Sequence, residues 1–166
     1  MGMFKLFRNT LYIRIEPENI ALLHVESGSQ FADIPMLAIE TRKGKSTIIA
    51  TGRDALMLSG RDNLTISNGF RHPRTLLADF AIAEQTLKHF VRKTLPKSLF
   101  VTSPVMIIQP LALLEGGLTQ IEIRAFAELG ALAGARQVYL WVGPELTRDE
   151  LSKLDFARAG GQLLFP

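Results

Sequence analysis

Few residues of this chain have the type and spacing that metal binding or nucleophilic catalysis requires. The three histidines, His24, His72 and His89, lie far apart in the sequence and show no metal-ligand spacing. The chain has no cysteine, which excludes disulfides, thiol catalysis and cysteine-bound metals. We therefore expect each histidine to be a surface or packing residue, and we predict neither a metal site nor a catalytic residue.

Two glycine-rich segments, residues 115–118 and 159–161, raise the question of a phosphate-binding loop. They read Glu-Gly-Gly-Leu and Ala-Gly-Gly. A P-loop places a lysine and then a serine or threonine directly after its last glycine, because these side chains hold phosphate oxygens and magnesium. Neither segment has that pair, so both are predicted to be ordinary turns.

The composition indicates a folded domain without a strong attraction to polyanions. Hydrophobic residues make up 47% of the 166 residues and charged residues 21%, a balance typical of globular proteins. The net charge is only +3, and the local basic pairs, Lys43 with Lys45 and Arg71 with Arg74, have no aromatic residues interleaved. Nucleic-acid surfaces combine clustered basic residues with aromatic stacking platforms. We therefore expect no nucleic-acid partner.

The distribution of apolar residues favours a cytoplasmic protein. No apolar run approaches the roughly 20 residues that a membrane-spanning helix needs. Lys5 and Arg8 interrupt the apolar residues at the start of the chain, unlike the apolar stretch of a cleavable signal peptide. With the lack of cysteine, these features lead us to expect the cytoplasm.

Hydrophobic periodicity places the elements that would position any site. Residues 11–15 and 20–25 are apolar and flank a Glu-Pro-Glu-Asn turn, which predicts a β-hairpin. Apolar residues recur at helical spacing over 79–95 and 119–132. Further strands are predicted at 35–40, 47–51, 99–101 and 138–142, and a short helix at 53–59.

The order of these elements predicts an α/β fold. The strand at 99–101, the helix at 119–132 and the strand at 138–142 would form a βαβ unit, which makes a right-handed parallel crossover. The hairpin in front of it supplies antiparallel strands. We therefore expect a mixed sheet with helices on its faces.

The end of the chain is predicted to cover the last part of this sheet. Leu146, Leu151, Leu154 and Phe156 are compatible with a short helix, and residues 162–165 with a final strand. An uncovered sheet edge would invite aggregation, so we expect this tail to cap it.

Several segments, taken in order, resemble one protein family. Leu76-Leu77-Ala78-Asp79-Phe80 resembles the family's "V-I-A-D-F", and Thr119-Gln120-Ile121-Glu122-Ile123-Arg124-Ala125 resembles "T-Q-V-E-R-R-A". Residues 133–140 are similar to "A-G-A-R-E-V-F-L", and residues 50–55 to "A-V-G-x-D-A". The family is MreB, the bacterial actin that organises rod shape. The order and the approximate spacing agree from residue 3 to about residue 144.

The resemblance implies half of an actin fold, an actin-like and ribonuclease H-like mixed sheet with flanking helices. Residues 1–166 would be a single truncated actin-like domain. Subdomain IA would comprise about 10–30 and 75–166, and an IB-like insertion about 31–74. The second phosphate loop and the adenosine pocket of the family lie beyond the last matched segment.

The resemblance also implies that the phosphate-binding turn is degenerate. The family writes this turn "D-L-G-T-A-N-T", in which the aspartate arranges metal and water and the glycine lets backbone N–H groups approach phosphate. Here Arg14 replaces the acid, Glu16 replaces the glycine, and Pro17 lacks a backbone donor. Glu18 adds a second carboxylate, and only Asn19 is retained.

A second departure concerns the glutamate that positions the attacking water. The family's "I-E-E-P" corresponds to Trp141-Val142-Gly143-Pro144, so Val142 and Gly143 stand where the acids would be. A ribonuclease H-like nuclease would need acids on the first strand, and Arg14 argues against that activity. We therefore predict a pseudo-ATPase that is not an enzyme and has no cofactor.

Two segments are predicted to contact a membrane or a partner. One is the basic amphipathic start of the chain, which also resembles the membrane-binding start of the family: Phe4, Lys5, Leu6, Phe7 and Arg8. The other is residues 105–118, where the family has only a short turn. Its apolar residues include Met106, Ile107, Ile108 and Leu111. This second segment would cover a surface exposed by the missing half, or bind a partner.

The leading hypothesis is therefore a non-catalytic, MreB-like cell-shape accessory protein. It would bind the cytoskeletal filament or the membrane-associated morphogenesis machinery, with full-length MreB, other morphogenesis proteins or a second copy as partners. It would be cytoplasmic, with peripheral contact at the inner face of the cell membrane. The alternatives are an actin-fold adaptor for another membrane machine and a nucleotide binder without hydrolysis.

Overall fold

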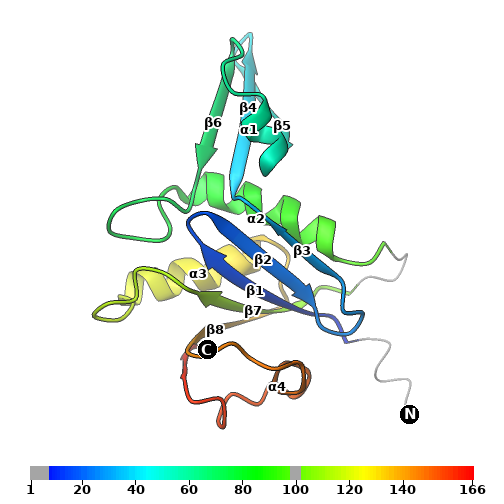
Figure 1. Cartoon of the computed structure of the whole chain (residues 1–166), viewed down its shortest axis with the longest axis vertical. Helices are drawn as coiled ribbons and strands as arrows, with labels where there is room; N and C mark the ends of the chain where they lie inside the picture. The colour runs from blue at the N-terminus through cyan, green and yellow to red at the C-terminus, as the bar shows by residue number, and fades with distance from the viewer. Residues whose placement is uncertain (1–7, 98–101) are drawn as a thin grey trace.

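Two sheets and four helices make up the part of the chain that the structure, a computed structural model, describes, residues 8–97 and 102–166 (Figure 1). The strands are β1 Thr10–Glu16, β2 Asn19–His24, β3 Gln30–Asp33, β4 Met36–Arg42, β5 Lys45–Thr51, β6 Leu64–Asn68, β7 Val105–Pro110, β8 Gln137–Val142 and β9 Gln162–Phe165. The helices are α1 Arg53–Met57, α2 Phe80–Thr94, α3 Gln120–Leu132 and α4 Arg148–Lys153. The α/β fold predicted from the sequence is confirmed.

The larger sheet has the strand order β3-β2-β1-β7-β8-β9. The predicted hairpin is present as β1 and β2, which pair antiparallel from Leu11 opposite His24 to Glu16 opposite Asn19. β7 runs parallel to both β1 and β8. The predicted βαβ unit is therefore present as β7-α3-β8, with a different first strand from the one expected.

The prediction that Met106, Ile107 and Ile108 contact a membrane or a partner is wrong. The predicted strand at 99–101 lies outside the described residues, and β7 occupies the centre of the sheet. Met106, Ile107 and Ile108 have no exposed surface, so they are not available to a membrane or a partner. Helices α2 and α3 cover one face of this strand and the tail covers the other, which explains its unbroken apolar run. Leu111 follows the strand half-buried, with its N–H donating to Ile15 O over 2.9 Å.

Helices α2 and α3 cover one face of the larger sheet and enclose the main core. Asp79 caps α2 by accepting a hydrogen bond from Ile82 N, and Thr119 with Glu122 forms a capping box at α3. Gly130 allows α3 to approach the sheet closely, because a Cβ there would lie 2.7 Å from Val138 Cγ2. Burial of the apolar stripes of these helices supplies most of the stabilisation of this layer.

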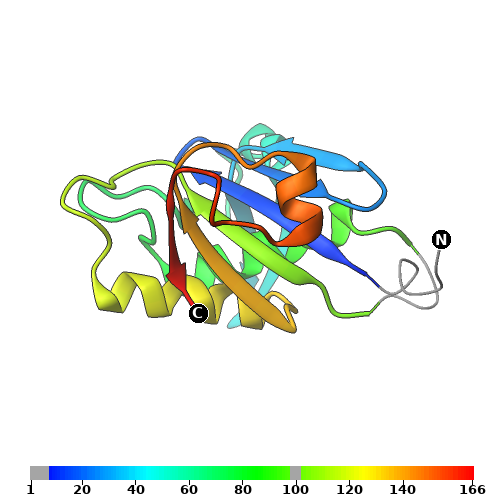
Figure 2. The ribbon, with the colours of Figure 1, turned by 90° about the horizontal axis from the view of Figure 1, so that it is seen from below.

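The tail covers the opposite face, as Figure 2 shows with α4 and α3 on either side of the sheet. The ring of Phe156 lies 5.2 Å from that of Tyr139 and 5.7 Å from that of Trp141, measured between centroids. Leu151 of α4 is buried in the same cluster. β9 pairs antiparallel with β8, so the expected short helix and final strand are both present.

The smaller sheet, with the order β5-β4-β6, projects beyond α2 at one end of the molecule (Figure 1). Asp33 fixes the start of α1, because its Oδ1 accepts a hydrogen bond from Arg53 N over 3.1 Å. Gly52 precedes this helix with φ of 68°, and a Cβ there would clash with the Asp33 carboxylate. Asp33 thus ties the junction between the two sheets to the helix.

His24 is a packing residue at the end of β2, in line with the sequence expectation. Its Nε2 lies 3.0 Å from Asn9 Oδ1, and its Nδ1 accepts a hydrogen bond from Ser27 N over 3.3 Å. Burial lowers the pKa of this imidazole below its ordinary value of 6.5, and the nearby Glu26 carboxylate offsets part of that effect. The folded protein therefore favours the neutral ring.

The position of β7 predicts a sharp contrast between two isoleucines. Ile108→Ala should lower the free energy of unfolding by about 2–5 kcal/mol, because the side chain is wholly buried and the substitution leaves a cavity. Ile121 is 81% exposed on α3, so Ile121→Ala should stay within about 0.5 kcal/mol of the parent. Urea unfolding of both variants checks this contrast, and equal effects would contradict a central β7.

The neutral His24 predicts a pH dependence of stability. Its folded-state pKa is lowered, so the unfolded state takes up the proton first as the pH falls below 6.5, and stability is lost there. His24→Gln should reduce the change of the unfolding free energy with pH between pH 7.5 and 5.5. His72, which is exposed, provides the matched control, and His72→Gln should keep the parent slope. A His24→Gln variant with the parent slope would overturn this assignment.

Candidate functional site

The predicted phosphate-site residues meet at one edge of the larger sheet. The parallel strands β1, β7 and β8 end there, since carboxyl ends of parallel strands share an edge. Arg14 of β1 lies opposite Gln109 of β7 in the register, and Val142 ends β8. Gly143 follows it and accepts a hydrogen bond at its carbonyl from Gln109 Nε2 over 2.6 Å. The fold therefore brings together the residues that the sequence placed in two separate motifs.

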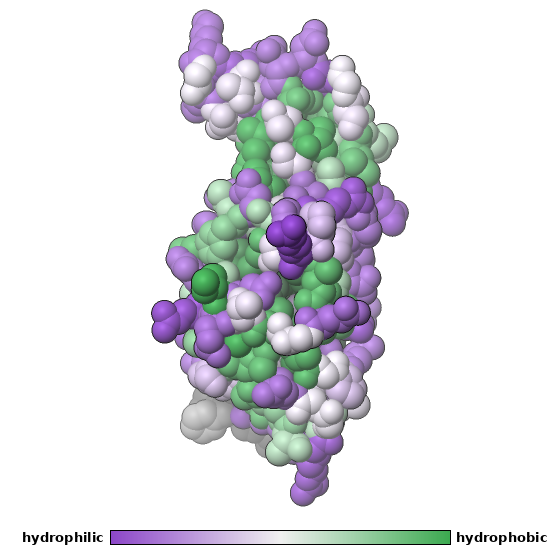
Figure 3. Space-filling model, turned by 90° about the vertical axis from the view of Figure 1, so that its left-hand side faces the viewer, coloured by the Kyte–Doolittle hydropathy of each residue, from purple (hydrophilic) through white to green (hydrophobic). Residues whose placement is uncertain are grey.

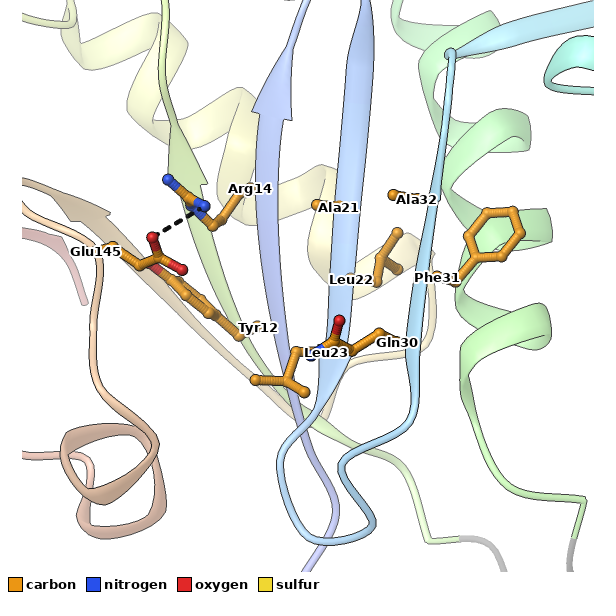
Figure 4. Close-up of a pocket in the computed structure, with 9 residues that line it drawn as sticks. All are labelled: Tyr12, Arg14, Ala21, Leu22, Leu23, Gln30, Phe31, Ala32 and Glu145. Atoms are coloured by element: carbon orange, nitrogen blue, oxygen red, sulfur yellow. Dashed lines mark ion pairs between the residues drawn. The ribbon is translucent and has the colours of Figure 1, made fainter.

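Arg14 is held by a carboxylate that sequence reasoning missed. Its Nη1 lies 3.3 Å from Glu145 Oε2, and the two side chains are 31% and 63% exposed (Figure 4). Its Nε is buried and has no hydrogen-bond partner among the described residues. At this exposure such an ion pair contributes about 0–1 kcal/mol. No local signal links these two residues, because they are distant in the sequence.

Tyr12 and Gln109 form a buried polar link beneath this ion pair. The Tyr12 hydroxyl donates to Gln109 Oε1 and accepts a hydrogen bond from Leu146 N over 3.2 Å. Burial is the main cause that raises the pKa of the Tyr12 phenol above its ordinary value of 10.0. Gln109 could have been found as the one polar residue in an apolar run, because a buried amide needs partners.

The turn between β1 and β2 is also occupied by groups of the chain itself. It is a two-residue turn of Pro17 and Glu18. Asn68 Nδ2 donates to Pro17 O over 2.7 Å, and Arg71 Nε donates to Glu18 Oε1 over 2.7 Å. Glu16 and Asn19 are exposed on either side of the turn. The turn is therefore bound to the end of β6 and to the segment that follows it.

The residues that this chain contributes do not fit a magnesium–nucleotide cradle. Arg14 is a cation where a metal-arranging acid would stand, and its guanidinium is paired with a carboxylate. Pro17 offers no N–H to phosphate. Glu16 and Glu18 would repel phosphate oxygens, since like charges a few ångströms apart oppose each other. Within residues 8–97 and 102–166, no three His, Cys, Asp or Glu side chains form a group able to hold a metal.

The predicted amphipathic start of the chain lies largely outside the described residues. Phe4, Lys5, Leu6 and Phe7 belong to that part, so their contact with a membrane stays a prediction. Arg8 is described, and its Nη1 donates to the carbonyl oxygen of Ser152 in α4 over 2.8 Å. None of the helices in the described part of the chain has the length and apolarity to cross a membrane.

Comparison with known proteins assigns the chain to a family. The family model for the MreB/Mbl protein matches residues 17–146. The cell shape-determining protein MreB of Pasteurella multocida is 32% identical over 139 residues, which cover 81% of this chain and 38% of that protein. The cell shape-determining protein Mbl of Bacillus subtilis is 28% identical over 142 residues, covering 85% and 40%. The chain thus spans less than half of the length of these relatives.

Solved structures agree on the fold. MreB5 of Spiroplasma citri bound to AMPPNP matches with a TM-score of 0.63 at 17% identity, covering 80% of this chain and 38% of that one. A non-polymerising mutant of MamK bound to AMPPNP matches with a TM-score of 0.61 at 14% identity, covering 81% and 40%. The fold is therefore actin-like. Because the family model matches most of the residues of this chain, the chain belongs to the MreB/Mbl family.

Proposed function

We propose that this chain is a non-hydrolysing, MreB-like cell-shape protein that binds the cytoskeletal filament. The observation that carries the proposal is the chemistry at the carboxyl ends of β1, β7 and β8. A cation, two exposed acids and a proline stand where family members are expected to cradle phosphate. The other contribution to this proposal is membership of a family whose relatives are named for determining cell shape.

The same edge supports a fold that needs no nucleotide. Gln109 bridges Tyr12 and the Gly143 carbonyl, and Leu146 N donates to the Tyr12 hydroxyl. These contacts tie β1, β7 and the segment after β8 to one another. Phosphoryl transfer depends on hydrogen-bond donors and a metal placed around the phosphate. Here the polar groups of the edge bond to one another instead. We therefore infer that the chain acts through its surfaces rather than through catalysis.

The side of the molecule that carries the loop before α3 is a candidate filament contact. Figure 3 faces this side and shows hydrophobic residues exposed among hydrophilic ones. Ile121, at the start of α3, and Leu113, in the preceding loop, are exposed. Exposed apolar residues that cluster on a surface favour contact with a partner. Residues 111–118 keep this proposed role, whereas residues 105–110 do not.

Membrane proximity is a further part of the proposal. Residues 4–8 read Phe-Lys-Leu-Phe-Arg, a short amphipathic and basic pattern that suits an anionic membrane surface. So small an apolar face binds weakly by itself, so contact would require support from a membrane-bound partner. We place the protein in the cytoplasm, at the inner face of the cell membrane.

The proposal predicts saturable co-sedimentation with polymerised full-length MreB from the same cell. Ile121→Lys should weaken pelleting by about tenfold, because it puts a charge into an apolar contact. Met57 lies on α1, which packs against the smaller sheet, and is 82% exposed. It provides the matched control, so Met57→Lys should pellet like the parent. No pelleting of the parent, while the polymer sediments, would sink the filament role and favour an adaptor for another membrane machine.

The altered phosphate site predicts that ATP with magnesium does not bind. Isothermal titration calorimetry should show no affinity tighter than about 1 mM for the parent chain. The double variant Glu16→Gly with Arg14→Asp restores two residues of the family pattern and shows whether the site can be rebuilt. Affinity of the parent in the micromolar range would contradict the proposal and support a nucleotide binder without hydrolysis.

A further inference from the structure

A hollow in the larger sheet lies beside Arg14, on the face that α4 covers in part. Arg14, Ala21 and Ala32 are register partners across β1, β2 and β3, so their side chains form one row on one face. The next row on that face includes Leu23 and Gln30. Because the two alanines have only methyl side chains, the surface along this row is lower than at the longer side chains on either side of it. The resulting cavity has a volume of about 330 Å³ (Figure 4).

The size and lining of this cavity suit a small ligand. Binding sites for small molecules have volumes of roughly 300–1,000 Å³ and combine an apolar surface with a few polar groups. Ala21, Ala32 and Leu23 provide the apolar part, and Gln30 provides an amide at the far end. At the near end, Arg14 and Glu145 form one wall.

Arg14 has hydrogen-bond donors that its ion pair with Glu145 does not use. A guanidinium has five N–H donors in a planar fork that fits a carboxylate. Here one nitrogen, Nη1, faces Glu145, and the buried Nε has no hydrogen-bond partner within the described residues. The Arg14 side chain is 31% exposed, so an acceptor in the hollow would bind the accessible part of the guanidinium rather than the buried Nε. Glu145 is mostly exposed, which makes its ion pair easy to replace.

We propose that this hollow binds a monocarboxylate with a small apolar body. The carboxylate would displace Glu145 from Arg14 and accept hydrogen bonds from the guanidinium. The hydrocarbon part would lie along the row of Ala21 and Ala32, against Leu23. The ligand chemistry is shared by a free short-chain acid and by the carboxyl terminus of a peptide.

The charges near the hollow favour a monoanion over phosphate. Glu16 lies on the same face of β1 as Arg14, two residues further along, and Glu145 stays nearby after displacement. A dianionic phosphate would meet two carboxylates with one guanidinium to balance them. A single carboxylate carries half of that charge and brings an apolar group for the methyl-lined surface.

The test uses the full chain and hexanoate, with neutral hexanamide as the matched control ligand. Titration followed by ¹H–¹⁵N NMR should give saturable shifts of the amides of Arg14, Ala21 and Ala32, with a dissociation constant on the order of 1 mM. Hexanamide should give no saturable shifts at these amides. N-acetyl-alanyl-leucine, with and without its free carboxyl group, identifies whether a peptide terminus binds more tightly than the free acid.

Three variants locate the binding to the hollow. Arg14→Gln should weaken hexanoate binding at least about tenfold, and Ala32→Leu should do the same by filling the row while keeping the guanidinium. Glu145→Gln should tighten binding up to about fivefold, because it removes the competing carboxylate. Arg92→Gln changes an exposed arginine on α2 and should bind like the parent. Urea unfolding of each variant confirms that the fold is retained.

Three results would overturn the proposal. The first is an Arg14→Gln variant that retains the fold and the parent affinity. The second is equal binding of hexanoate and hexanamide. The third is inorganic phosphate that binds at these amides more tightly than hexanoate. These outcomes are separate from co-sedimentation with MreB, which does not depend on the hollow.

Discussion

The hydrogen-bonded position of β7 between β1 and β8 is the constraint on which the rest of the structure depends. Met106 and Ile108 face the helices, and Ile107 faces the cluster under α4, so one strand supplies both cores. Its parallel register with β1 also sets Gln109 beside Arg14. Without that register, the ends of β1 and β8 would have no common edge, and the contacts of Gln109 with Tyr12 and Gly143 could not form.

The edge where these strands end is held by contacts within the chain. In the family pattern, an acid and glycine-rich backbone face phosphate. Here Arg14 is paired with Glu145, and the β1–β2 turn is bonded to Asn68 and Arg71. Each contact is modest, because most of these groups are partly exposed. Together they bind most polar groups of the edge from within the chain, and the buried Nε of Arg14 is left without a partner among the described residues.

Much of the fold could be predicted because its signals are local. The hairpin followed from two apolar strands around a proline turn, and α3 from a capping box and helical spacing. The role of residues 105–118 was predicted wrongly in part, because a short apolar run is equally compatible with a buried strand and with an exposed patch. The run of four apolar residues at Val105–Ile108 was the available signal, and the preference for a strand at 99–101 obscured it.

The sequence by itself determined which chemical groups stand at the predicted phosphate turn, since these residues lie close together in the chain. An arginine for an acid and a proline for a donor act wherever the turn lies. Only the tertiary structure decided what those residues do instead. Arg14 meets Glu145, and Ala21 meets Ala32 to form the hollow, because strand register brings together side chains that no local pattern connects. The pairing of strands joins residues that are distant in the sequence, and it depends on which strands pack together in the core.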